Sequence, residues 1–446
     1  MNIGQQETLN LITRNISGQI GGSNNRLHLF ITGQAGTVVK VGALSEVAAR
    51  LVRRSTLHSM LKLPVQKDGR IVQMPLLSGQ YLQHMRLEWK DVEFIFIDEI
   101  SMVPYEMLCM IEFRLRQLKS PEEMFGEINV LLFGDLMQIP LVKRQPVFSQ
   151  SRHMIPATHL WELFTLIELT QNMRQQGDTT FFDVLNALRI GELTTSHMFV
   201  LMSRVSTETD GEFSIEKAMR IYPTNKQVEA HSNKVLQYFR EKNVEMFTIR
   251  ALDSLVDATR PLKNSIDTVI SDDINKTGGL PRELVIFVST KVMLRSNIDV
   301  QKGLVNGTIG FVTELKWAGG FRRGQIYKQD IPGVMVDFGV DGIHLIKPKS
   351  IQFPEKFSYG TAERRMLPLI LSWASTAHKM QGTTVDYAVV YLGRKLFVQG
   401  QAYVIISRVR SFNGLHTEEL DASKITGKTS CNVDALDEIE RMRQRL

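Results

Sequence analysis

The sequence predicts an α/β protein whose core is made of buried parallel strands. Phe94 to Ile97 form an unbroken apolar run with two β-branched residues, which is typical of a strand buried on both faces of a parallel sheet. Two further strand-like runs follow, Ile128 to Phe133 and Thr165 to Leu169, and an amphipathic helical pattern covers Glu106 to Lys119. At 446 residues the chain is too long for one ordinary core, so two or three domains are expected.

The composition is that of a soluble globular protein, with 43% hydrophobic and 22% charged residues. No apolar run is long enough to span a bilayer, and Met1 leads directly into polar residues rather than a signal peptide, so we expect an intracellular protein without membrane contact. The two cysteines, Cys109 and Cys431, exclude a disulfide framework and a four-cysteine zinc site. The net charge of +6 permits a nucleic-acid partner without requiring one.

A glycine-rich turn follows the first predicted strand, Leu27 to Thr32. Its sequence, Gly33 to Thr37, is typical of the start of a phosphate-binding loop, because small residues let backbone N–H groups face the phosphates. A complete loop reads Gly-x-x-x-x-Gly-Lys-Ser/Thr and continues as a helix. Here Val38 to Leu44 instead predicts a second strand beside the first, although neighbouring parallel strands need a crossover of roughly a dozen residues. The lysine, the Mg²⁺-binding hydroxyl and the helix are therefore missing, and Lys40 has no helix to aim it.

Polar residues follow two of the buried strands, at the edge where open α/β sheets bind ligands. Asp98 would hold a hydrated Mg²⁺ beside nucleotide phosphates, and Glu99 would polarise the water that attacks the γ-phosphate. An acidic helix start explains the same pair equally well. After the next strand, Gln138 would sense the γ-phosphate or orient the water, and the alternative is a simple turn capped by Asp135.

The second half of the chain returns to buried strands at Met219 to Tyr222 and Leu367 to Trp373, with strands or other buried segments at Val385 to Leu392 and Ala402 to Ile406. From Val285 to about Phe353, short β patterns separated by glycine-containing turns predict a small barrel or a twisted sheet. This half is therefore expected to be a second α/β region interrupted by a β-rich insert.

Five signatures occur along the chain in one order. They are Gly33–Thr37, Asp98-Glu99, Gly134-Asp135 with Gln138, Gln171-Asn172-Met173-Arg174, and His378-Lys379-Met380-Gln381-Gly382 followed by Tyr403 through Arg408. With them, the chain closely resembles the PIF (petite integration frequency) family of ATP-dependent DNA helicases, relatives of RecD in superfamily one, from its first residues to about Leu415. The resemblance implies two RecA-like P-loop NTPase domains with parallel sheets, residues 1–205 and 206–446, and a small β-barrel insert at about 290–362 in the second.

The resemblance also implies a nucleotide site between the two domains. The residues that would contact ATP are Gln5 of an adenine-reading motif that begins at Asn2, Gly33, Ala35, Gly36, Thr37 and Gly382. The residues similar to the family's catalytic groups are the Mg²⁺-binding Asp98, the water-activating Glu99, the γ-phosphate sensor Gln138, and Arg174 and Arg408, which close on the γ-phosphate. Gln381 with Gly382 resembles the motif that couples ATP closure to strand movement.

Four positions match residues that line the family's single-stranded DNA track, where backbone contact gives binding without sequence readout: Thr56, His58, His378 and Lys379. Taken alone, the polar stretch from Ser55 to Ser59 is a loop with helix-capping residues.

Three departures from the family pattern accompany these matches. The phosphate-loop lysine and the helix after it are absent, Glu46 stands where glycine is usual, and Ile139-Pro140-Leu141 stands where Pro-Pro-Val is more usual. Because the flanking residues fit the family well, the gap resembles a single internal deletion.

The resemblance predicts an ATP-dependent DNA helicase with 5′ to 3′ movement that uses Mg²⁺ with ATP, acts on single-stranded and forked duplex DNA as a monomer, and serves DNA repair, recombination or telomere maintenance. The nucleus is the expected location, with the mitochondrion as the alternative. The missing lysine keeps three other readings open: an ATPase-defective helicase, a catalytically inactive single-stranded DNA-binding remnant, and a mobile-element or gene-model fragment without function.

Overall fold

A computed structural model describes the protein over residues 28–33, 42–44, 48–49, 56–64, 74–139, 141, 144–150, 152, 157–169, 178–206, 210–256, 269–317, 330–356 and 360–445. The predicted positions outside these described residues are Asn2, Gln5, Ala35, Gly36, Thr37, Lys40, Glu46, Pro140 and Arg174. The chain divides into two compact units, the first made of Met1–Glu208 with Met380–Leu446 and the second of Thr209–Lys379. The predicted division into domains at residues 205 and 206 stays a prediction.

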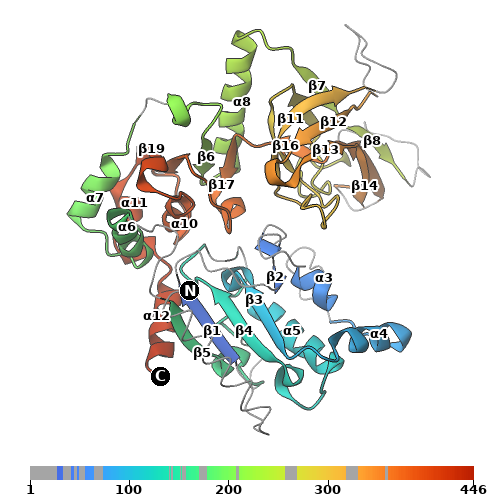
Figure 1. Ribbon diagram of the computed structural model, residues 1–446, viewed down its shortest axis with the longest axis vertical. Helices are drawn as coiled ribbons and strands as arrows, with labels where there is room; N and C mark the ends of the chain where they lie inside the picture. The colour runs from blue at the N-terminus through green and yellow to red at the C-terminus, as the bar shows by residue number, and fades with distance from the viewer. Residues whose placement is uncertain are drawn as a thin grey trace. The chain divides into compact units, whose positions relative to one another are not determined.

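A five-stranded sheet forms the centre of the first unit (Figure 1). In spatial order its strands are β2 (Gly42–Ala43), β3 (Phe94–Asp98), β4 (Asn129–Gly134), β1 (His28–Gly33) and β5 (Thr165–Leu169). Every neighbouring pair runs parallel. The side chains of Ile97, Leu131 and Leu132 are fully buried, as expected for strands covered on both faces. The predicted α/β class is thereby confirmed.

The structure corrects the predicted place of the second strand. β2 pairs with β3 through Gly42 beside Ile97 and Ala43 beside Asp98. Both β3 and β4 lie between β2 and β1, so the strands that the short connection joins are not neighbours. β2 is only two residues long and pairs with the last two residues of β3, at the carboxyl edge of the sheet, so entering β2 from the end of β1 does not require a return to the amino edge through a crossover helix. The absence of the phosphate-loop lysine from the sequence is unaffected.

The described helices of the first unit lie in both of its chain segments. They are α3 (Leu57–Leu61), α4 (Gly79–Trp89), α5 (Tyr105–Leu118), α6 (Thr179–Arg189), α7 (Thr195–Met202), α10 (Gln401–Ser407), α11 (Ala422–Ile425) and α12 (Val433–Arg443). α5 confirms the predicted amphipathic helix, because Met107, Ile111 and Leu115 are buried along one face. Pro104 precedes its first turn, where the missing proline N–H costs nothing.

The C-terminal segment adds two parallel strands to the first unit, β18 (Ala388–Leu392) and β19 (Leu415–Leu420). The buried run after residue 400, which the sequence left open between a strand and another segment, is α10. All of its residues are buried, so it carries no polar face from which a helical period could be read. α12 packs against β5, and its Arg443 forms an ion pair with Glu168 at 2.7 Å.

The second unit is mostly antiparallel β structure. Besides α8 (Asn225–Glu241), its described strands are β6 (Met219–Tyr222), β7 (Phe247–Arg250), β8 (Leu252–Leu255), β9 (Glu283–Ile286), β10 (Lys291–Leu294), β11 (Ile309–Lys316), β12 (Gly333–Asp337), β13 (Ile343–Ile346), β14 (Lys349–Pro354), β15 (Thr361–Met366), β16 (Leu369–Leu371) and β17 (Ala374–Thr376). They form the sheets β13-β12-β11-β10-β16, β14-β15-β8 and β7-β9, while β17 runs parallel to β6. The β-rich insert is present, and its closure into a barrel stays a prediction.

One predicted strand in this unit is shorter than expected. The run from Leu367 to Trp373 predicts one strand, but β16 covers only Leu369–Leu371, where it pairs antiparallel with β10, and β17 begins after the run at Ala374. Trp373 is buried against Phe239 and Phe287 between the two strands. Among the helices that the structure describes, none combines the length and apolar character required to cross a membrane.

Candidate nucleotide and nucleic-acid sites

Two carboxylates lie at the carboxyl end of β3, where Asp98 is the last strand residue. The backbone of Glu99 is left-handed, with φ 52° and ψ 51°, a conformation that non-glycine residues rarely adopt outside constrained sites. The Glu99 N–H donates to Asp98 Oδ1 at 2.8 Å. At the end of the adjacent β4, a Cβ on Gly134 would lie 2.8 Å from Ile100 N, so glycine lets the strand end approach this turn. The two strand ends therefore hold the carboxylates in a tight turn.

Asp98 fits a Mg²⁺ ligand. Burial raises the pKa of its carboxyl group, while the Glu99 N–H opposes that rise, and a bound cation would favour the ionised form. Within the described residues, no group of three or more histidine, cysteine or acidic side chains could hold a metal on its own. Mg²⁺ is commonly held by one or two carboxylates together with water and nucleotide phosphates. The residues at this edge would therefore hold Mg²⁺ together with a nucleotide.

The two predicted glutamines lie close together in the first unit. The side-chain amide of Gln381 donates to the backbone oxygen of Ile139 at 3.3 Å, next to Gln138 in the chain. Both glutamines are buried, and the Oε1 atom of Gln138 has no hydrogen-bond partner among the described atoms. A buried amide oxygen without a partner costs free energy, so it is poised to accept a hydrogen bond from water or a ligand.

Gly382 brings the same segment to the carboxylates. Its φ is +78°, and a Cβ placed on it would lie 3.6 Å from Glu99 Oε1 and 4.0 Å from Ala48 Cβ. The backbone after Gln381 thus passes within van der Waals distance of the predicted water-activating acid. Any larger residue here would be strained, since positive φ is costly for side chains with a Cβ.

Arg408 is fully buried after the end of α10. Its guanidinium donates to Ser407 Oγ at 2.9 Å, to Val404 O at 3.1 Å and to Thr383 O at 3.4 Å. Burial lowers the pKa of Arg408, and the nearby charge of Glu99 opposes this effect. The charges of Arg408 and Glu99 are therefore close enough to interact. The hydrogen bonds of the guanidinium itself go to Val404, Ser407 and Thr383.

Asp135, which the sequence left as a turn cap, is the centre of a buried network. Its carboxylate accepts a two-pronged ion pair from Arg189 on α6, with the shortest distance 2.9 Å, and a hydrogen bond from the Tyr403 hydroxyl at 2.8 Å. It also accepts from the Met137 N–H at 3.1 Å. Sequence analysis missed Arg189, which has no motif around it. Tyr403 belongs to the fifth signature, so the sequence singled it out but did not assign it a role.

The predicted DNA-contacting residues occur in both units. In the first unit, Thr56 forms a parallel bridge to Ala43 and caps α3 by accepting from Ser59 N at 3.2 Å, so the stretch expected to be a loop is the start of a short helix. His58 lies in the same helix, and burial lowers its pKa. In the second unit, His378 and Lys379 lie in a short 3-10 helix, Ala377–Met380, directly after β17. Burial lowers the pKa of each side chain. Thr56, His58 and His378 are half-buried, whereas the side chain of Lys379 is exposed at the surface.

A parallel sheet with acids at its carboxyl edge, and the Gln381-Gly382 segment beside them, is an arrangement typical of α/β proteins that bind nucleotides. Residues 21–198 match the family model described as PIF1-like helicase, and residues 271–315 match the model of the DNA helicase Pif1 2B domain. The chain is 31% identical to the ATP-dependent DNA helicase PIF1 of Danio rerio, and the match covers 94% of this chain and 62% of the relative. The protein belongs to the PIF1-like helicase family.

Other comparisons agree with this assignment. The human ATP-dependent DNA helicase PIF1 is 28% identical, with 88% of this chain and 58% of the relative covered. The chain thus spans about three fifths of the length of these curated relatives. The crystal structure of Pif1 helicase from Candida albicans has the same fold, with a TM-score of 0.72, 22% identity, and coverage of 100% of this chain and 99% of that one. A Bacteroides Pif1 structure in complex with ADP-AlF3 and single-stranded DNA gives a TM-score of 0.68 at 22% identity, with coverage of 100% and 97%.

Proposed function

We propose that this chain is an ATP-dependent DNA helicase that moves 5′ to 3′ and whose ATP hydrolysis is weakened by the incomplete phosphate loop. The observation that carries the proposal is the convergence, within one unit, of Glu99, Gln138, Gln381, Gly382 and Arg408 from segments far apart in the sequence. The names of the related proteins support the same activity.

Each residue would have a separate task. Asp98 would hold Mg²⁺, which neutralises charge on the phosphates when bound. Glu99 would polarise the attacking water, and the unpaired Gln138 Oε1 would accept a hydrogen bond from that water. Arg408 would exchange its bonds to Thr383 and Ser407 for γ-phosphate oxygens, since a guanidinium binds such oxygens strongly.

The DNA partner in this proposal is a single strand or a forked duplex, bound by a monomer through Thr56, His58, His378 and Lys379. Roles in repair, recombination or telomere maintenance in the nucleus, or alternatively in the mitochondrion, belong to the same proposal and rest on the resemblance to the PIF family. A second candidate is a single-stranded DNA-binding protein without turnover. It is favoured by the absence of the lysine that normally contacts the β and γ phosphates.

The deciding experiment is ATP hydrolysis by the purified chain with and without single-stranded DNA, with Glu99→Gln as the matched variant. A helicase should show DNA-stimulated turnover that falls about a hundredfold or more in the variant, because the water loses its activating carboxylate. Turnover at the background level, together with retained DNA binding, would establish the second candidate instead.

A further inference from the structure

A group of polar side chains in the second unit is not used by the nucleotide site. Arg295 and Ser296 directly follow β10, and His378 and Lys379 follow β17. Three atoms of this group are buried and have no hydrogen-bond partner within the described residues: Arg295 Nε, Ser296 Oγ and His378 Nε2. Buried polar atoms are normally paired, so several unpaired ones in two neighbouring chain segments point to a ligand.

The charges of this group are also unbalanced. Burial lowers the pKa of Lys379, and repulsion from the nearby Arg295 guanidinium lowers it further. Burial likewise lowers the pKa of Arg295. No described carboxylate contributes to either shift. A half-buried guanidinium and a neighbouring ammonium group that repel one another raise the free energy of this arrangement, and a bound anion would offset that cost.

The orientation of Arg295 is set by a neighbouring loop. Its Nη2 atom donates to Asn275 Oδ1 at 3.1 Å, and its backbone N–H donates to Pro368 O at 2.9 Å. Gly279 lies so close that a Cβ on it would be 2.9 Å from Arg295 O. Asn275 and Gly279 belong to one turn, which closes through the Gly279 N–H and the oxygen of Ile274 at 2.8 Å.

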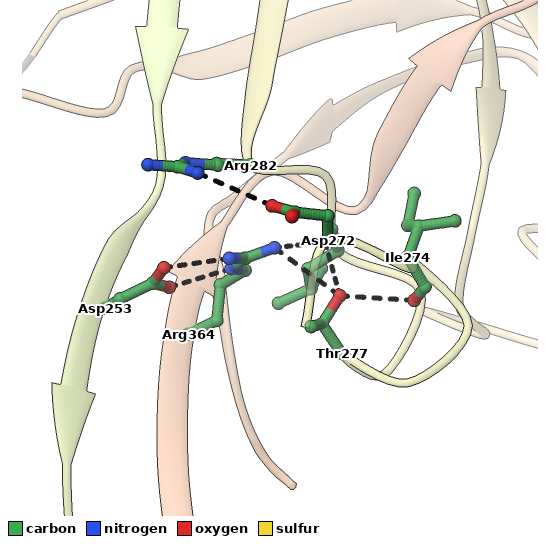
Figure 2. A network of polar contacts seen from close by, with 7 residues as sticks. Asp253, Asp272, Ile274, Thr277, Arg282 and Arg364 are labelled. Carbon is green, nitrogen blue, oxygen red and sulfur yellow. Dashed lines mark hydrogen bonds and ion pairs between the residues drawn. The ribbon is translucent and has the colours of Figure 1, made fainter. Parts of the chain in front are cut away.

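That turn is fixed by a buried ion pair (Figure 2). Arg364, only 2% exposed, holds both carboxylate oxygens of Asp253 at 2.7 and 2.8 Å and donates to Leu280 O at 3.2 Å. The same guanidinium reaches the Thr277 hydroxyl, which in turn donates to Ile274 and Leu280. A two-pronged arginine–carboxylate pair is geometrically specific, so it holds the turn and, through Asn275, the direction of Arg295.

We propose that Arg295 and Lys379 together bind one phosphate group of a single-stranded nucleic acid, with Ser296 and His378 as additional donors. The proposal deepens the DNA-binding part of the proposed function and rests on it. Two cations with hydroxyl and imidazole donors suit a phosphodiester, which offers charge and acceptor oxygens but no donors. Asn275 is a positioning residue, because it acts through the Arg295 guanidinium.

The test is the salt dependence of binding to a labelled thymidine homopolymer, measured by fluorescence anisotropy at several KCl concentrations. For single strands the slope of log affinity against log salt is about −0.7 per phosphate contact. Arg295→Gln should therefore reduce the slope by about 0.7 and weaken binding about fivefold at roughly 0.1 M salt. The matched control is Arg250→Gln, which removes the same charge from an exposed pair with Glu283 in the same unit. Arg295→Lys should keep the slope, since it keeps the charge.

The outcomes separate this inference from the proposed function. If Lys379→Gln weakens binding while Arg295→Gln matches the Arg250→Gln control, the phosphate pair is rejected and the DNA-binding proposal stands. If the wild-type protein does not bind the strand, both are rejected. If inorganic phosphate binds to the wild type and not to Arg295→Gln, while their salt slopes agree, the site takes free phosphate and the strand assignment is overturned. Should Arg295→Gln not fold, the slopes of Arg295→Lys and Asn275→Ala decide.

Discussion

Asp135 shows how the role of one residue depends on partners that lie far away in the sequence. Its side chain is 1% exposed, and an ionised carboxylate cannot be buried without compensation. Arg189 supplies the opposite charge, and Tyr403 supplies a hydroxyl hydrogen bond from the C-terminal segment. Burial beside this carboxylate raises the pKa of Tyr403, so its hydroxyl stays a donor. The network joins the turn that bears Gln138 to α6 and α10.

Removing either partner should destabilise the first unit by different amounts. Arg189→Met would leave a buried carboxylate without its cation and should cost about 3–5 kcal/mol of unfolding free energy. Tyr403→Phe removes one hydrogen bond and should cost about 1–3 kcal/mol. Urea unfolding followed by circular dichroism measures both values.

The control for these variants is Arg394→Met, which breaks an ion pair with Asp421 in which the arginine is 88% exposed. An exposed pair contributes little, so this variant should lie within about 0.5 kcal/mol of the wild type. If Arg189→Met and Arg394→Met unfold alike, the buried network does not stabilise the unit.

The contact between α8 and β6 makes an element of the second unit sensitive to acid. His231 on α8 is 6% exposed, and its Nδ1 atom lies 3.4 Å from the Tyr222 hydroxyl on β6. Burial, together with the positive charges of Arg220 and Lys234, lowers the pKa of His231 to about 3. The imidazole is therefore neutral inside the fold and becomes charged more readily when the chain unfolds.

Acid should weaken this element in a defined window. Below about pH 6.5, His231 is protonated in the unfolded chain but stays neutral in the folded protein. The free energy of unfolding therefore falls as the pH drops from 6.5 toward 3. Between pH 7 and pH 5 the loss due to His231 should be about 2 kcal/mol. His231→Gln should lack this component, and urea unfolding at the two pH values compares the variant with the wild type. Equal losses in both proteins would show that His231 does not titrate differently on folding.

At the scale of the whole molecule, the nucleotide site depends on the return of the chain after the second unit. Gln381 and Gly382 reach Ile139 and Glu99 only because Met380–Leu446 belongs to the same compact unit as the parallel sheet. A nucleotide bound at this site would therefore contact both segments of the first unit. Since a ligand that binds only the folded state stabilises it, binding should be visible as a change in thermal stability.

Addition of Mg²⁺ with a non-hydrolysable ATP analogue should raise the melting temperature of the wild-type protein by a few degrees. A ligand at about a hundred times its Kd contributes roughly 2.7 kcal/mol to folding. Asp98→Asn should reduce this shift, because it removes the carboxylate that would hold Mg²⁺, while keeping the shape of the side chain. Differential scanning calorimetry with and without EDTA gives the measurement. An equal shift in both proteins would contradict the assigned role of Asp98.

Much of the first unit could be predicted because its signals are local. The strand from Phe94 to Ile97 and the helix after Pro104 are both indicated by the spacing of apolar residues within a few positions of one another. Both are confirmed. The position of β2 could not be predicted, since strand order depends on which edges meet in space. The end of β16 at Leu371 was missed for a related reason. β16 pairs with β10 and β17 pairs with β6, and such pairing decides where each strand ends.

The amino-acid sequence by itself determined the fold class and the family, and it singled out Asp98, Glu99, Gln138 and Gln381 as candidate site residues, because these rest on short motifs whose order along the chain is specific. Only the tertiary structure decided that Arg408 is buried, that Asp135 is paired with Arg189 and Tyr403, and that Arg295 lies near Lys379. Electrostatic and hydrogen-bond partners act across distances of a few ångströms in space. The separation of two residues along the sequence does not determine their distance in space, so these partners can be identified only in the folded structure.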